Sequence, residues 1–200
     1  MNSEMKSKLK KWILTMIGIA LLGAGVALAT VPQLGTDPLA GFNEALSRIS
    51  GISLGRMTSL VELAMILFCF LFYRECIGIG TLLSMFLVQF PIDFVSVMLG
   101  KPASLFSGIL MILAGTVLIA LGAELIMYGK LGMGPYEAFI STIGKLTKMK
   151  FSFAKYLCDG SFLVLTALLK GYVGIGTIII FVLCPKLMEV IENILKHYDL

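Results

Sequence analysis

The sequence predicts an all-α membrane protein with six transmembrane helices, arranged as two inverted repeats of three spans. Three observations predict this architecture: long apolar runs, a helix-breaking phrase that occurs twice, and an odd number of spans in each half. Of the 200 residues, 58% are hydrophobic and 14% are charged, whereas soluble domains carry about 25% charged residues. With a mean hydropathy of +0.97, the chain is too apolar for a soluble globule. We expect a single integral membrane domain over residues 1–200.

Six apolar runs are long enough to cross a bilayer, which takes about 20 residues each. They cover about 12–32, 53–73, 77–99, 104–127, 152–170 and 174–196. The first run follows a lysine-rich start and ends in Ala27-Leu28-Ala29, which fits a signal-peptide cleavage site. We expect this run to be retained as a span, because its end is repeated deep inside the chain.

The repeat is clearest in two helix-breaking phrases, "QLGTDPLAGF" (33–42) and "KLGMGPYEAF" (130–139). A second matching pair, "IGIGTLL" (77–83) and "VGIGTII" (173–179), follows later in each half. These pairs place the first repeat at about 12–99 and the second at about 104–196.

Each phrase leads into a short polar helix, at 38–50 and at 135–149. Both are too short and too polar to span a membrane, so each half contains three spans. An odd number forces the second half to enter the membrane inverted, as in many transporters. If the short helices did span, the halves would be parallel, which their polar content disfavours.

Basic residues predict the orientation, because cytoplasmic loops are enriched in lysine and arginine. With a cytoplasmic N-terminus, eleven basic residues fall inside and four outside: Arg48, Arg56, Lys101 and Lys170. Lys155 is counted among the eleven inside. Both termini are therefore expected in the cytoplasm. The same distribution explains the net charge of +4 without nucleic acid as a partner.

The residue content offers little material for an enzyme. The four cysteines form no C-x-x-C pair, and His197 is the only histidine. We therefore expect no disulfide framework, metal site, cofactor or catalytic residue, and we do not expect an enzyme.

The two phrases are the predicted solute site. Proline suits the first turn of a helix, and glycine allows the sharp turn before it. If the short helices are re-entrant, their N-termini would present free N–H groups to a polar or anionic solute. The predicted substrate-binding residues are Gly35, Thr36, Asp37, Pro38, Gln89, Gly132, Gly134 and Pro135. Alternatively, both helices lie on the surface, and Asp37 is either a ligand or only a helix cap.

Acidic residues within the spans form a second set of candidates. Glu62 and Asp159 lie 97 residues apart, which is the main repeat offset, and Asp93 and Glu189 also correspond. Intramembrane carboxyl groups are costly and usually face the bundle interior or a cavity. They are candidates for coupling transport to a proton or another cation, with a structural ion pair as the alternative.

Prolines and glycines at corresponding positions predict kinks and close helix contacts. Pro91 and Pro185 lie within the last span of each half, and such interruptions are a pointer to a transport site. Close contacts are expected at Gly23/Gly25, Gly78/Gly80 and Gly174/Gly176.

The stretches "LGTDP" (34–38), "GISLG" (51–55) and "GIGT" (78–81) resemble the YitT/YczE-like family of bacterial integral membrane proteins, and the resemblance covers most of the chain. It implies a multi-pass protein of the bacterial cell (inner) membrane and adds no catalytic residue. Some YitT members carry a C-terminal soluble domain; we expect none here, because the chain stops at Leu200.

Two functions fit these patterns. The first is a small transporter or channel for a small polar or anionic solute, and the alternative is a non-transporting membrane scaffold or regulator of a partner protein. A polar cavity touched by both phrases would favour transport, whereas a packed centre with surface-bound short helices would favour a scaffold. The expected surroundings are the lipid bilayer, and the sequence is compatible with a homo-oligomer.

Overall fold

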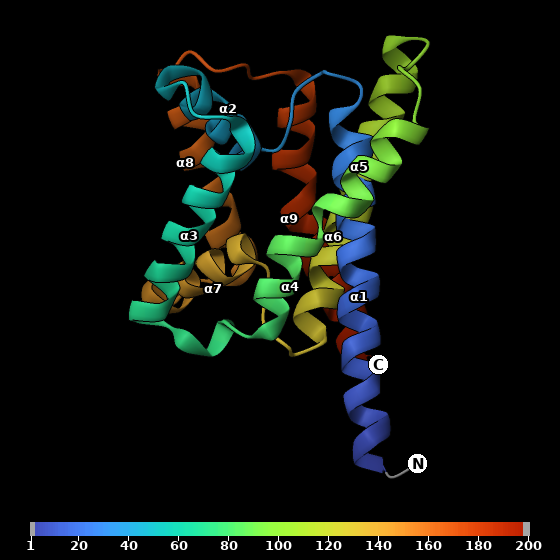
Figure 1. Ribbon diagram of the computed structural model, residues 1–200, viewed down its shortest axis with the longest axis vertical. Coiled ribbons are helices and arrows are strands. Elements are labelled where there is room, and N and C mark those ends of the chain that lie inside the picture. Colours follow the sequence, from blue (N-terminus) through green and yellow to red (C-terminus); the bar gives the residue numbers. More distant parts are fainter. Residues whose placement is uncertain (1–2, 198–200) are drawn as a thin grey trace.

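The computed structural model describes residues 3–197, in which helices are the only regular secondary structure (Figure 1). The all-α prediction is therefore confirmed. The long helices are α1 (Ser3–Thr30), α3 (Leu54–Phe72), α6 (Leu105–Tyr128), α8 (Phe151–Leu168) and α9 (Ile175–His197). The shorter elements are α2 (Pro38–Ser50), the 3-10 turn η1 (Arg74–Cys76), α4 (Ile79–Leu87), α5 (Gln89–Met98) and α7 (Pro135–Thr147).

Within residues 3–197, five segments are long and apolar enough to cross a membrane. They are Met5–Thr30, Leu54–Phe72, Ile79–Met98, Leu105–Tyr128 and Phe151–Leu168, and they match the first five predicted spans. The sixth predicted span corresponds to α9, whose second half carries Lys186, Glu189 and Glu192. Both chain ends that were predicted to be cytoplasmic, 1–2 and 198–200, lie outside the described residues.

Helices α1 and α6 cross closely, because glycines face each other at two levels. A Cβ added to Gly18 would lie 2.7 Å from the carbonyl oxygen of Gly122, and one on Gly25 would lie 2.6 Å from the amide nitrogen of Ile119. Small residues allow such close backbone approach. A Cβ on Gly23 would lie 2.7 Å from the carbonyl oxygen of Val88. The predicted contacts at Gly23 and Gly25 are thus confirmed.

Each phrase forms a turn that is hydrogen-bonded to the other half of the chain. Gly35 and Gly132 have φ values of +114° and +118°, which favour glycine. The carbonyl of Leu34 accepts a hydrogen bond from the Gly176 amide at 2.8 Å, and that of Leu131 accepts one from the Gly80 amide at 2.7 Å. The turn of one half therefore fixes the start of the last span of the other.

The short helices α2 and α7 begin at Pro38 and Pro135, as predicted. Each packs against both α3 and α8. Their first residues are buried, whereas Ile49 and Leu146, near their ends, are exposed. Both helices therefore start inside the bundle and end at its surface.

The two prolines of the last spans behave differently. Val88 separates α4 from α5, three residues before Pro91, because proline has no N–H to continue the helical hydrogen bonds. In contrast, α9 continues through Pro185 without a break in the helix. The helix is thus interrupted in the first half, and the predicted kink at Pro185 stays a prediction.

Candidate functional site

A cavity of about 540 Å³ lies among α1, α2, α3, the α4–α5 segment and α7. Both phrases line it, the first through Asp37, Leu39 and Ala40 and the second through residues 134–137. Its polar side chains are Asp37, Asn43, Thr58, Ser59, Glu62, Ser84, Gln89, Asp93, Tyr136 and Glu137. The apolar wall includes Leu22, Val26, Met85 and Ile92. The fold thus joins residues from both halves around one cavity that has both polar groups and an apolar wall.

Every charged group that lines this cavity is acidic. Asp37, Glu62, Asp93 and Glu137 contribute carboxyl groups, and no lysine, arginine or histidine is among the lining residues. Within residues 3–197 the ion pairs are Lys155–Asp159 and Lys196–Glu192. The four lining carboxyl groups therefore have no ion-pair partner in the described part of the chain.

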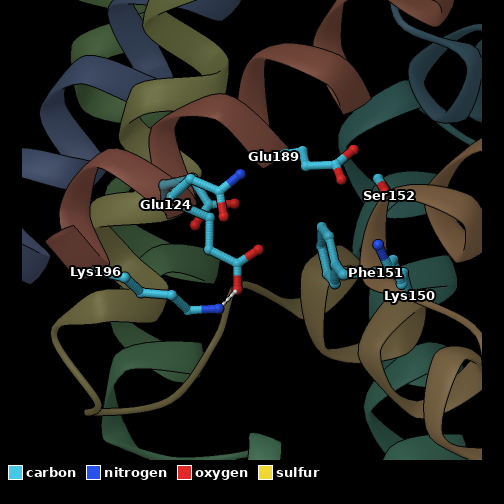
Figure 2. A pocket seen from close by; sticks show the side chains of 8 residues that line it. Glu124, Lys150, Phe151, Ser152, Glu189 and Lys196 are labelled. Atoms are coloured by element: carbon cyan, nitrogen blue, oxygen red, sulfur yellow. Dashed lines mark hydrogen bonds and ion pairs between the residues drawn. The ribbon is translucent and has the colours of Figure 1, made fainter.

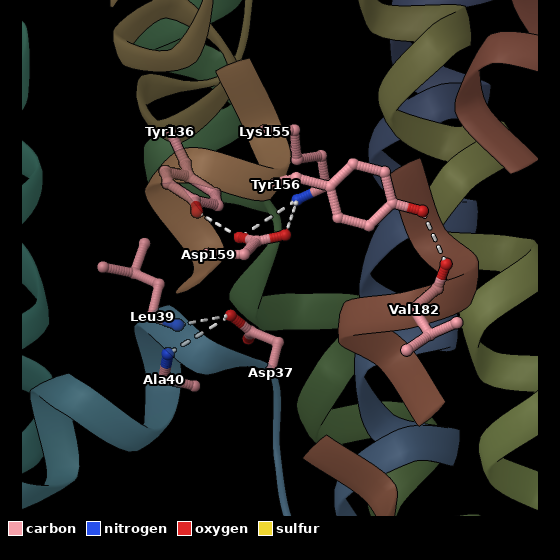
Figure 3. A network of polar contacts seen from close by, with 8 residues as sticks. All are labelled: Asp37, Leu39, Ala40, Tyr136, Lys155, Tyr156, Asp159 and Val182. Carbon is pink, nitrogen blue, oxygen red and sulfur yellow. Dashed lines mark hydrogen bonds and ion pairs between the residues drawn. The ribbon is translucent and has the colours of Figure 1, made fainter. Parts of the chain in front are cut away.

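Carboxyl groups of the chain itself cover the starts of both short helices. Asp37 Oδ1 accepts hydrogen bonds from the amides of Leu39 at 3.0 Å and Ala40 at 3.2 Å (Figure 3). In α7, the Glu137 carboxyl group lies against Gly134. Its Cδ is 3.3 Å from the position that a Cβ added to Gly134 would take. Carboxylates are favourable at helix N-termini. Asp37 is therefore a helix cap that also lines the cavity.

Asn43, which lines the same cavity, carries a buried hydrogen-bond acceptor. This side chain of α2 is 2% exposed, and its Nδ2 lies 3.5 Å from the hydroxyl of Thr58. Among the described residues, its Oδ1 has no hydrogen-bond partner. A buried acceptor without a partner costs about 1–3 kcal/mol, so a ligand that donates a hydrogen bond there would recover this energy.

Asp159 lies in a closed network between α7 and α8. Lys155 Nζ is 3.1 Å from Asp159 Oδ2, and the Tyr136 hydroxyl donates to Asp159 Oδ1 (Figure 3). The Lys155 ammonium group also lies 4.9 Å from the centre of the Tyr136 ring. The residue after Lys155 is Tyr156, and its hydroxyl donates a hydrogen bond to the carbonyl of Val182 in α9 at 2.8 Å. These contacts close the bundle between α7, α8 and α9.

A second cavity, of about 360 Å³, lies on the α9 side of the bundle (Figure 2). It is lined by Glu124, Lys150, Phe151, Ser152, Glu189, Glu192, Asn193 and Lys196. Lys196 pairs with Glu192 at 2.5 Å. No residue lines both cavities, so the two spaces are separate in this structure.

The structure brings half of the predicted site residues together. Those that line the larger cavity are Asp37, Glu62, Gln89, Asp93, Gly134 and Pro135. Gly35 and Gly132 form the turns, Pro38 is buried at the start of α2, and Thr36 faces the carbonyl of Asp37. Asp159 lies in the closed network, and Glu189 lines the second cavity. Corresponding acidic residues of the two halves are therefore in different surroundings.

Sequence reasoning missed Asn43, Tyr136, Glu137 and Lys155. It counted Lys155 among the cytoplasmic loop charges, which is wrong, because this side chain is buried in α8 beside Asp159. The signal was present: a lysine and an aspartate four residues apart face each other on a helix. Asn43 carried no comparable signal, since its burial depends on how α2 packs.

The chain is similar over most of its length to bacterial relatives. It is 27% identical to the uncharacterized protein YyaS of Bacillus subtilis (strain 168), with 95% of this chain and 96% of the relative covered. It is 27% identical to the uncharacterized membrane protein YczE of the same strain, covering 90% and 84%. An uncharacterized protein of Haemophilus influenzae is 23% identical, covering 91% and 83%.

No solved structure matches the chain. The family model described as "Family of unknown function (DUF6198)" matches residues 9–193. This match and the similarity to YczE confirm the resemblance to YczE-like membrane proteins. Since the match covers nearly all of the sequence, the chain belongs to the DUF6198 family of YczE-like bacterial membrane proteins.

Proposed function

We propose that this protein carries a small polar solute across the bacterial inner membrane. The observation that carries the proposal is the cavity of about 540 Å³ that both phrases line. A scaffold would instead have a packed centre and short helices on its surface. The buried starts of α2 and α7 favour re-entrant helices and a transport site.

The proposed architecture has six spans in two inverted repeats, with both chain ends in the cytoplasm. Crosswise contacts support it: α2 of the first half packs on α8 of the second, and α7 packs on α3. The Leu34–Gly176 and Leu131–Gly80 hydrogen bonds form another exchanged pair. With 23 residues and a rise of 1.5 Å per residue, α9 is about 34 Å long. That length is sufficient for the sixth span.

A difference between the halves favours a carrier over an open channel. Ser84 lines the larger cavity and its counterpart, Ile180, belongs to the hydrophobic core, although both side chains are buried, at 2% and 3% exposed. Glu62 also lines the cavity, whereas its counterpart Asp159 is closed off by Lys155. At Glu62 the first half is thus open to the larger cavity, whereas the matching position of the second half is closed by an ion pair, with a smaller cavity lined by Ser152 and Glu189 on that side. In an inverted-repeat carrier the halves exchange these conformations, which gives alternating access.

Cysteine labelling tests this proposal. In a background without the four native cysteines, Ser84→Cys and its counterpart Ile180→Cys would be treated with a membrane-impermeant thiol reagent from each side. We expect Ser84→Cys to react from the outside and Ile180→Cys to react from the cytoplasm. Adding Lys155→Met, which breaks the closed network, should speed labelling at Ile180→Cys and slow it at Ser84→Cys.

The background protein and each variant must elute as one symmetric peak in detergent, which controls for folding. Reciprocal changes at the two positions would support alternating access. Failure of Ile180→Cys to react under any condition, together with no effect of Lys155→Met on Ser84→Cys, would overturn the carrier and favour the scaffold.

A further inference from the structure

The charges around the larger cavity select the kind of solute. Asp37, Glu62, Asp93 and Glu137 line it, and the lining residues include no basic side chain. A recess with apolar walls and charges of one sign concentrates solutes of the opposite sign. The positive ends of α2 and α7, which could have attracted an anion, already lie against Asp37 and Glu137. The geometry therefore argues against the anionic solute that the sequence left open.

The shape of the site argues against a bare metal ion. Among residues 3–197, no group of three or more potential metal ligands lies close enough together to hold one. The cavity, at about 540 Å³, has the size of pockets that hold small organic molecules. Leu22, Val26 and Ile92 supply an apolar wall that would contact a hydrocarbon portion.

The buried amide of Asn43 supplies an independent indication. Its Oδ1 has no partner among the described residues, although the side chain is only 2% exposed and lines the cavity. An oxygen acceptor is complementary to an N–H donor. A protonated amine would therefore satisfy both the acceptor and the surrounding carboxyl groups.

We infer that the solute is a small organic cation with a protonated amino group and an apolar portion. The inference rests on the proposed function, since it assigns the substrate class of the same cavity. Asp37, Glu62 and Glu137 supply the opposite charge, Asn43 accepts a hydrogen bond from the amine, and the α1 and α5 wall contacts the hydrocarbon.

Charge selectivity can be measured at Ser84→Cys without knowing the natural solute. The rates of reaction with trimethylammonioethyl and sulfonatoethyl methanethiosulfonate would be compared, each divided by its rate at the exposed Ser50→Cys. We expect the normalised ratio to favour the cationic reagent by at least roughly tenfold, since several carboxylates act together. Glu62→Gln should lower the ratio roughly fivefold. Glu44→Gln, on the exposed face of α2, should leave it unchanged.

A ratio near one would overturn the cationic assignment while leaving the carrier intact. If neither reagent reached Ser84→Cys or Ser59→Cys, which stands at a more exposed position of the same cavity, the aqueous cavity itself, and with it the proposed function, would fail. The two failures are therefore distinguishable.

Protection experiments then identify the class of cation. Butylammonium, tetramethylammonium, sodium and butyrate ions would be added at equal ionic strength before labelling of Ser84→Cys. We expect protection by butylammonium above that by tetramethylammonium, which lacks an N–H donor, and no protection by sodium or butyrate. Equal protection by sodium, greater protection by butyrate, or protection by none of the four would overturn the inference.

Asn43→Leu tests the amide directly, because leucine has a similar size and cannot accept a hydrogen bond. This change should raise the butylammonium concentration needed for half protection by about tenfold. The rate of labelling without added ions and the effect of tetramethylammonium should stay the same. An unchanged butylammonium concentration would remove Asn43 from the site.

Discussion

The ammonium group of Lys155 lies 3.1 Å from the carboxylate of Asp159, and the two side chains are 9% and 1% exposed. At the corresponding positions of the first half, Thr58 and Glu62 line an open cavity. Equivalent places in the repeat thus hold a closed ion pair in one half and, in the other, a carboxyl group without an ion-pair partner among the described residues. This asymmetry underlies the predictions that follow.

Replacing Lys155 by methionine should destabilise the protein, because it leaves the Asp159 charge buried without a positive counter-charge, with only the Tyr136 hydroxyl as a partner. A loss of about 3–5 kcal/mol is expected for breaking a buried ion pair. Lys155→Met combined with Asp159→Asn should restore most of the stability, as measured by thermal unfolding in detergent. Lys196→Met, which breaks an exposed pair, is the control and should cost under about 1 kcal/mol. Equal losses for Lys155→Met and Lys196→Met would contradict the assignment.

Glu62→Gln should leave stability nearly unchanged and should reduce uptake, because Glu62 has no ion-pair partner and lines the cavity. Uptake of butylammonium into proteoliposomes would measure the effect, with melting temperature recorded on the same preparations. The matched control is Glu44→Gln on the exposed face of α2, which should change neither quantity. Wild-type uptake in Glu62→Gln would exclude this carboxyl group from the transport mechanism.

Gly35→Ala should be much more destabilising than Gly51→Ala, although both glycines have positive φ values. An alanine Cβ at position 35 would lie 2.6 Å from Thr177 Oγ1 and 2.9 Å from the Thr177 amide. At Gly51 nothing lies within 4 Å, so only backbone strain of about 1–2 kcal/mol remains. Melting temperatures of the two variants would be compared. Similar losses would mean that the turn at Leu34 does not need its close approach to the other half.

Gly25→Ala should disrupt the crossing of α1 and α6, because its Cβ would lie 2.6 Å from the Ile119 amide and 2.7 Å from the Gly115 carbonyl. Overpacking of this kind costs about 1–3 kcal/mol. The control is Gly160→Ala in α8, whose Cβ would meet its nearest neighbour at 3.7 Å. That change should be neutral or stabilising by up to about 1 kcal/mol, since alanine favours helix. Thermal unfolding would reveal the difference, and a stable Gly25→Ala would contradict the close crossing.

The sequence predicted those features that depend mainly on residues close together in the chain. The length of the apolar runs, the helix starts at Pro38 and Pro135, and the close contacts of Gly25 follow from hydrophobicity and backbone geometry. The Pro91 break was predicted for the same reason. At Pro185 the helix α9 is not interrupted.

The sequence by itself therefore determined that this is a helical membrane protein with two helix-breaking phrases and an internal sequence repeat. Only the tertiary structure decided that Asp37, Glu62, Asn43 and Glu137 share one cavity, while Asp159 and Glu189 lie elsewhere. The physical reason is that side-chain surroundings depend on packing between distant helices. Matching positions in the repeat have the same place in the chain and matching helix neighbours, yet they carry different side chains. Lys155 pairs with Asp159 in the second half, whereas Thr58, at the matching position of the first half, offers Glu62 no such charge.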